Sequence, residues 1–265
     1  MEDLDQLKPS RPIIPVAVQL LLFFLLWFMG ALVGNLLFGW YLDLFVLDAT
    51  TPIEDIDLFQ PKYFIPMSAL HALFGLLLPV LYFKRITRVR IWDFVQISPK
   101  LKGRWIVYTL LAAVVGLFAM EALAMLSEPI AEYLPSDYYF QLREETNEMY
   151  QALFVHSDVG QLVITLFVFA LIPAVVEEVL FRGILFGKLM ETSKGNIHFA
   201  AIVSGLLFAA VHQNPLDLLP ITFMGVGFAY FYHYSKNLTY TIILHFLING
   251  IQITAAFISQ DLNLF

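Results

Sequence analysis

Long uncharged, apolar runs alternate along the chain with short polar segments. No Asp, Glu, Lys or Arg occurs in 12–42, 63–83, 159–176, 195–216, 218–235 or 237–260, and 105–126 contains only Glu121. A helix needs about 20 mostly apolar residues to cross the hydrocarbon core of a bilayer. The pattern therefore predicts seven membrane-spanning helices, at about 14–38, 63–83, 105–126, 159–190, 197–213, 217–235 and 238–258.

The basic residues predict how these helices are oriented. If the N-terminus is inside, every Lys and Arg except Lys62 and Arg143 lies in or beside an inner segment. Inner loops of membrane proteins carry an excess of Lys and Arg. We therefore expect an all-α, polytopic membrane helix bundle with its N-terminus inside. The outer segment 127–158 is polar and long enough to hold an amphipathic helix with a solvated acidic face.

Composition narrows the class of protein further. Apolar residues make up 59% of the chain and charged residues 14%, against roughly 45–50% and about 25% in soluble domains. This surplus predicts the lipid bilayer as the environment. A net charge of −7 argues against nucleic acid as a partner, because binding phosphates needs a basic surface. The chain has no Cys, which excludes disulfides and thiolate metal sites.

Ionisable groups inside the predicted spans are the candidates for chemistry, because burying charge in a membrane is costly. The fourth span holds the densest set. Glu178 and Arg182 are four residues apart and share a helix face, so they are expected to pair. Glu177 lies about 100° around the helix and has no such partner. Pro173, one turn earlier, removes a helix hydrogen bond and is expected to kink the span.

Two other spans carry histidines. His212 ends the fifth span, whose small residues permit close approach of a neighbouring helix: Ala200, Ala201, Ser204, Gly205, Ala209 and Ala210. His245 and Asn249 share one face of the seventh span.

These side chains allow three interpretations. They can be polar contacts between helices. A carboxylate with a histidine can take a proton from water, while a second histidine and an amide hold an oxyanion. Alternatively, Glu177, His212 and His245 can bind Zn²⁺ and acidify bound water.

Three motifs, in this order, carry a family resemblance: Glu177-Glu178-x-x-x-Arg182, Phe208-x-x-x-His212 and His245-x-x-x-Asn249. Together they resemble the CPBP family of intramembrane proteases, which includes the type II CAAX prenyl endopeptidases and the bacterial Abi proteins. The resemblance covers 159–258.

It implies that Glu177 is the catalytic carboxylate, with His212 as its partner. His245 and Asn249 would be the oxyanion pair, and Glu178 and Arg182 supporting residues. The family has been described both as zinc-dependent and as metal-independent, so the cofactor is left open as none or zinc.

The expected organisation is a three-span region at 1–158, with a basic inner loop and an acidic outer loop, a four-span catalytic core at 159–258 and a tail at 259–265. Eight spans occur in the best-described CAAX relatives, against seven predicted here. The expected function is hydrolysis of a membrane-associated protein or peptide in the bacterial plasma membrane. A prenylated substrate is not implied, and no oligomeric state is predicted.

Two other functions fit the same residues. One is a non-catalytic immunity or assembly partner that keeps the motifs as structural contacts. The other is a transporter that uses Glu121, Glu177 and the histidines as a proton relay. The absence of inverted repeats in the sequence argues against the transporter.

Overall fold

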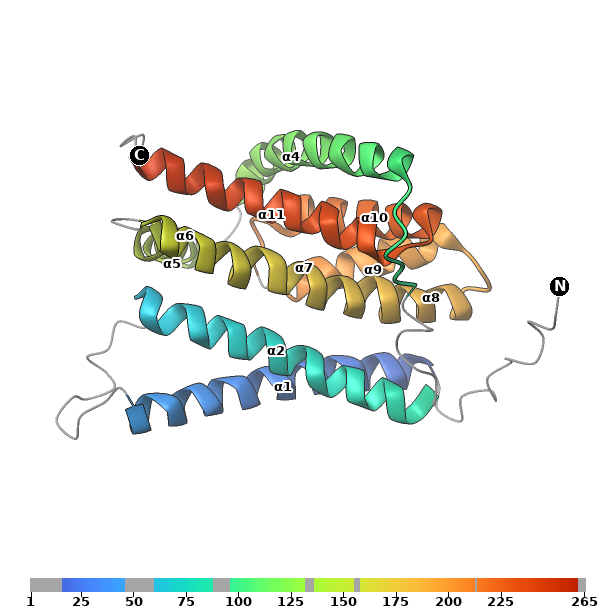
Figure 1. Cartoon of the computed structure of the whole chain (residues 1–265), viewed down its shortest axis with the longest axis horizontal. Helices are drawn as coiled ribbons and strands as arrows, with labels where there is room; N and C mark the ends of the chain where they lie inside the picture. Colours follow the sequence, from blue (N-terminus) through green and yellow to red (C-terminus); the bar gives the residue numbers. More distant parts are fainter. Residues whose placement is uncertain are drawn as a thin grey trace.

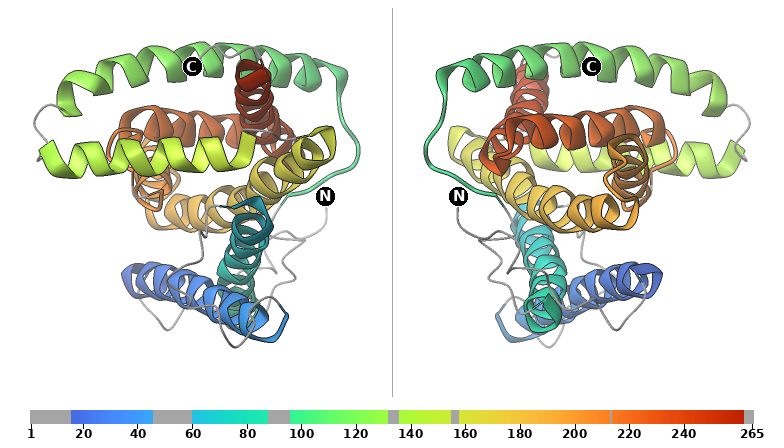
Figure 2. Two further views of the ribbon diagram at one scale, coloured as in Figure 1. Left: turned by 90° about the vertical axis from the view of Figure 1, so that its left-hand side faces the viewer. Right: turned by 90° about the vertical axis from the view of Figure 1, so that its right-hand side faces the viewer.

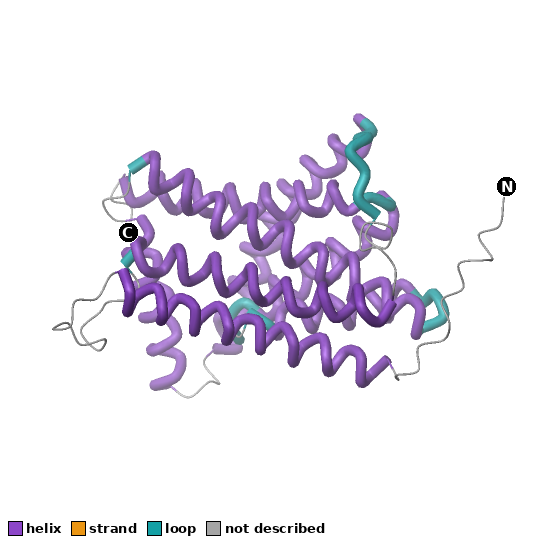
Figure 3. Tube along the Cα trace, turned by 60° about the horizontal axis from the view of Figure 1, so that its bottom comes forward, coloured by secondary structure: helices purple, strands orange, loops and turns teal. Residues whose placement is uncertain are grey.

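The computed structural model describes residues 16–45, 60–87, 96–131, 136–154, 158–212 and 214–261. These parts form helices joined by turns and loops, without a strand among them (Figure 3). The all-α prediction is therefore confirmed. In chain order the helices are α1 (Val16–Phe45), α2 (Pro61–Thr87), α4 (Gly103–Ala131), α5 (Ser136–Phe154), α6 (Val159–Leu166), η3 (Phe167–Leu171), α7 (Ile172–Glu177), η4 (Glu178–Phe186), α8 (Gly187–Thr192), α9 (Ile197–Ala210), α10 (Leu218–Ser235) and α11 (Leu238–Asp261).

Five helical segments are long and apolar enough to cross a membrane: Leu21–Leu44, Pro61–Tyr82, Gly103–Ser127, Val159–Thr192 and Leu238–Ser259. They make the chain a multi-pass membrane protein. Helices α9 and α10 match the remaining two predicted spans in position. At 14 residues, however, α9 is only about 21 Å long, which is shorter than the hydrocarbon core. The count of seven and the inside N-terminus stay predictions.

The helix run from α6 to α8 lies in the middle of the molecule (Figure 1). It contacts α2 on one side, and α9, α10 and α11 on the other. Beyond α10 and α11 lies α4, while α1 packs against the outer side of α2. Helix α5 crosses the direction of α6–α8 at one end of the bundle (Figures 1 and 2). The predicted helix in 127–158 is thus confirmed as α5.

The central run is one continuous helix from Val159 to Thr192 with two π-helical parts, η3 and η4. Such wide turns occur mostly inside α-helices and often at functional sites. Pro173 follows η3 in the first turn of α7. In a regular α-helix, Pro173 would leave the carbonyl of Phe169 without its donor. The side-chain amide of Asn249 on α11 donates to that oxygen at 3.4 Å.

Helices α9 and α10 touch through two glycines. A Cβ on Gly225 would lie 2.8 Å from Cα of Gly205, and a Cβ on Gly205 would lie 2.8 Å from the backbone nitrogen of Val226. Both contacts are with backbone, which cannot move aside as a flexible side chain can. The close approach predicted from Gly205 is therefore present, and it places α10 beside the central run.

Gly225→Ala should destabilise the protein by about 1–3 kcal/mol, because the methyl group overpacks the contact between α9 and α10. Gly227→Ala on the same helix is the matched control, since a Cβ there meets nothing within 4 Å. Alanine is also favoured over glycine inside a helix by about 1 kcal/mol. Thermal unfolding in detergent measures both effects. Equal unfolding temperatures for the two variants would contradict this packing.

Candidate active site

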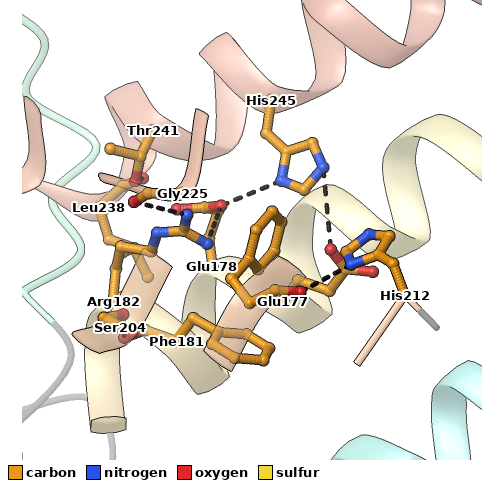
Figure 4. Close-up of polar contacts among 11 residues, drawn as sticks. Glu177, Glu178, Phe181, Arg182, Ser204, His212, Gly225, Leu238, Thr241 and His245 are labelled. Carbon is orange, nitrogen blue, oxygen red and sulfur yellow. Dashed lines mark hydrogen bonds and ion pairs between the residues drawn. The ribbon is translucent and has the colours of Figure 1, made fainter. Parts of the chain in front are cut away.

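A buried ion pair lies at the centre of the site (Figure 4). The side chains of Glu178 and Arg182 are both 0% exposed, and Nη1 of Arg182 lies 2.9 Å from Oε1 of Glu178. Nη2 of Arg182 donates to the carbonyl oxygen of Gly225 on α10 at 3.1 Å. The guanidinium also lies over the rings of Phe208 and Phe228, 4.3 and 5.0 Å from their centroids. The predicted pairing of Glu178 with Arg182 is confirmed.

His245 on α11 lies between the two neighbouring glutamates (Figure 4). Its Nδ1 is 3.0 Å from Oε1 of Glu178, and its Nε2 is 3.9 Å from Oε2 of Glu177. Oε1 of Glu178 already accepts a hydrogen bond from Nη1 of Arg182, and the same oxygen faces Nδ1 of His245 as an acceptor. The proton of a neutral His245 therefore lies on Nδ1. Its Nε2 can donate only when the imidazole is positively charged.

Glu177 differs from Glu178 in its surroundings. Its side chain is 25% exposed. Its Oε2 is buried and forms no hydrogen bond with the described residues. Oε2 of Glu178 is also buried without a hydrogen bond from the described residues, so the exposed fraction of the side chain is what distinguishes the two carboxylates. Glu178 is thus buried between Arg182 and His245, whereas the side chain of Glu177 is partly exposed.

His212 lies in the turn that follows α9, and its ring overlaps the carboxylate of Glu177 in the view of Figure 4. The side chains of His212 and Glu177 make no direct hydrogen bond to each other. Nδ1 of His212 lies 2.7 Å from the carbonyl oxygen of Phe208. Because a carbonyl only accepts, Nδ1 carries the proton. Nε2 of the neutral ring is then an acceptor, as a general base requires.

Phe208 separates the two histidines. Its ring packs edge to face on both, with centroids 4.9 Å from His212 and 6.0 Å from His245. Phe208 stood in the sequence motif, but its part in the site was not predicted. Gly225 was missed as well, because its carbonyl carries no sequence signal. The described contacts place Glu177, Glu178, Arg182 and the two histidines in one site.

Two predicted candidates lie apart from this group. Asn249 is one turn along α11 from His245, and its amide binds the carbonyl of Phe169. Its role as an oxyanion donor stays a prediction. Glu121 is exposed on α4, and within the described residues it forms no hydrogen bond or ion pair with the glutamates or histidines of the site. A proton relay that includes Glu121 is therefore not supported by a direct contact between Glu121 and the site.

Asp217, in the loop between α9 and α10, is a further carboxylate near His212. Asn214 donates from Nδ2 to Oδ2 of Asp217 at 2.6 Å. Burial raises the pKa of Asp217, and the nearby charges of His212 and Arg143 oppose that shift. Asp217 lies outside the five candidate spans. Its carboxylate is near enough to His212 for their charges to interact.

The fit of a metal can be judged from the donor side chains. Among the described residues, no group of three or more His, Cys, Asp or Glu side chains is arranged to hold a metal ion. Glu177, His212 and His245 thus do not form a preassembled zinc site in this geometry.

Comparisons with known proteins point to one family. Residues 159–251 match the family model described as type II CAAX prenyl endopeptidase Rce1-like. YdiL of Bacillus subtilis (strain 168), whose name describes a membrane peptidase, is 33% identical over 142 residues, covering 53% of this chain and 54% of YdiL. The membrane-embedded CAAX protease MroQ of Staphylococcus aureus (strain USA300) is 39% identical over 92 residues, covering 33% of this chain and 37% of MroQ. The chain thus spans about half the length, or less, of these relatives. No solved structure matches it.

Proposed function

We propose that this multi-pass bacterial membrane protein is an intramembrane endopeptidase of the CPBP family, whose type II CAAX prenyl endopeptidase model matches residues 159–251. The observation that carries the proposal is the contrast between two adjacent glutamates. The side chain of Glu178 is 0% exposed and binds Arg182 and His245, whereas the side chain of Glu177 is 25% exposed, so that water or substrate can approach it. The substrate class is a protein or peptide at the membrane.

In the proposed reaction, Glu177 and Nε2 of His212 bind a water molecule, and one of these two groups accepts a proton from it. The hydroxide oxygen forms a bond to the carbonyl carbon of the substrate, and the π electrons move to the carbonyl oxygen. The tetrahedral intermediate then breaks its C–N bond as the proton passes to the leaving nitrogen. The products are a carboxylic acid and an amine, so atoms and charge balance.

His245 is proposed to stabilise the oxyanion. Glu178 holds Nδ1 of His245 and so directs Nε2 toward Glu177. A protonated His245 would donate from Nε2 to the developing negative charge. Asn249 would be a second donor, one helical turn away. To act in that way, its amide must leave the carbonyl of Phe169, so we expect substrate binding to change this contact.

Hydrolytic activity should survive treatment with a strong metal chelator, because the donor set is not preassembled for a metal ion. The measurement is cleavage of a membrane-associated peptide by the purified protein before and after chelation, with added zinc as the return arm. Loss of activity on chelation, with recovery on adding zinc, would show that zinc belongs to the mechanism.

Cell-wide protein termini provide the test of function itself. We expect termini present in wild-type cells to vanish in a Glu177→Ala strain with matched expression of the protein. Such termini would also identify the substrate and the cleavage position. Identical termini in the two strains, with a cellular phenotype that survives the substitution, would instead support a non-catalytic immunity or assembly partner.

A further inference from the structure

A short polar segment, residues 96–102, is tied to the turn between α10 and α11 and is called the strap here (Figure 1). The backbone nitrogen of Leu238 donates to the carbonyl of Gln96 at 2.7 Å. Asn237, only 5% exposed, accepts from the nitrogen of Ser98 at 3.0 Å and donates to its oxygen at 3.1 Å. The nitrogen of Lys102 donates to the hydroxyl of Tyr240. The strap is therefore fixed in place at both of its ends.

The strap lies where two candidate spans begin. One span starts at Gly103, directly after the strap, and the other starts at Leu238, which binds it. Trp105 packs against Phe231 and Tyr240, with ring centroids 5.6 and 6.1 Å apart. Tryptophan is enriched at the level of lipid headgroups. These positions place the strap at the membrane surface.

The strap and the turn present positive charge without a carboxylate. Lys100, Lys102, Arg104 and Lys236 are all exposed. No Asp or Glu occurs in 96–104 or 236–240, and none of the four cations forms an ion pair with a carboxylate of the described residues. Through Ser98, Asn237 holds the strap that carries Lys100 and Lys102 against the turn that carries Lys236.

The backbone conformation of Lys236 guides the choice of a substitution that tests its charge. Lys236 ends α10 with φ at +52°. This left-handed position favours glycine or asparagine and disfavours a side chain such as lysine. Lys194 has the same backbone conformation, so this conformation does not single out Lys236, but it makes asparagine a substitution that removes the charge without straining the backbone.

We propose that the strap and the α10–α11 turn form a binding site for the phosphate of an anionic phospholipid. Lys236 and the strap lysines contact the phosphate from two sides of Asn237. The lipid's acyl chains extend alongside α4 and α11, whose spans begin at this level. The site does not depend on the proposed peptidase function.

The test uses the full chain in detergent, with phosphatidylglycerol or phosphatidylcholine added, and native mass spectrometry to measure bound lipid. Wild-type protein should bind phosphatidylglycerol in preference to phosphatidylcholine. Lys236→Asn should weaken phosphatidylglycerol binding about fivefold, as expected for one basic residue at a membrane surface. Because asparagine suits the left-handed backbone, the variant should unfold at the wild-type temperature or above.

Lys194→Asn is the matched control. Lys194 also has positive φ, at +54°, and is exposed. It lies in the turn between α8 and α9, and within the described residues it has no hydrogen bond to the strap. The control should keep wild-type binding, whereas Lys100→Gln with Lys102→Gln should lose it. Equal losses at Lys194 and Lys236 would show diffuse attraction and overturn the site, as would no loss at Lys236. Displacement of the lipid by soluble glycerol phosphate at equal concentration would also overturn it.

Discussion

Glu177→Gln is expected to abolish peptide-bond hydrolysis while the protein still folds. The amide keeps the shape of the carboxylate but cannot take a proton from water. General acid–base groups contribute about 10²–10⁴-fold to rate, so activity should fall by at least about 100-fold. The fold should survive, because the side chain is 25% exposed and its Oε2 makes no hydrogen bond with the described residues. Cleavage assays and thermal unfolding of the purified protein measure both effects.

Glu121→Gln is the matched control for Glu177→Gln. It makes the same chemical change in another membrane helix, at an exposed position on α4. Full hydrolytic activity is expected, and a large loss of activity would instead support a proton relay that includes Glu121. Glu178→Gln should behave differently from both, with loss of stability as well as activity, because Glu178 binds Arg182 and His245. A fully active Glu177→Gln variant would exclude the mechanism.

Arg182→Met is expected to lower the free energy of unfolding by about 3–5 kcal/mol. Removing one member of a buried ion pair leaves the other as an uncompensated charge. Both side chains are 0% exposed, so water cannot compensate Glu178 without rearrangement of the core. The substitution also removes the hydrogen bond from Arg182 to the carbonyl of Gly225, together with the cation over the ring of Phe208. Unfolding by heat or by a denaturing detergent measures the change.

Arg182→Lys separates charge from geometry. A lysine keeps the positive charge but lacks the planar fork with which Arg182 contacts Glu178 and Gly225 together. Its loss of stability should therefore fall between those of wild type and Arg182→Met. Equal stability of Arg182→Met and wild type would mean that this pair does not stabilise the folded state.

The parts of the site predicted from sequence are those within one helix or one motif. The Glu178–Arg182 pair follows from residues four apart, and the lack of a partner for Glu177 on its own helix follows from its neighbouring position. The small residues of α9 likewise predicted a close helix contact, which Gly205 makes with α10. Each of these inferences needs only the period of a helix.

Contacts between helices were beyond such reasoning. The hydrogen bond from His245 to Glu178 joins residues 67 apart in sequence, and helical period says nothing about which helices are neighbours. The π-helical turns were missed because wide turns have no residue signature as strong as that of proline. Asn249 was interpreted either as an oxyanion donor or as a polar contact between helices, but its partner, the carbonyl of Phe169, could not be predicted because the shape of the partner helix was unknown.

The wide turns η3 and η4 limit how this helix can change in length during evolution. Each residue inserted into or deleted from a helix rotates everything beyond it by about 100°. Between Asp158, which caps the start of α6 through the nitrogen of Gln161, and Glu177, one deletion would turn the carboxylate away from His245 unless η3 were lost with it and so took up the change. Length differences among homologues that keep this site are therefore expected in the loops outside Asp158 and Ser193. Where a sequence alignment places a gap inside 159–192, that gap marks a homologue without one of the wide turns.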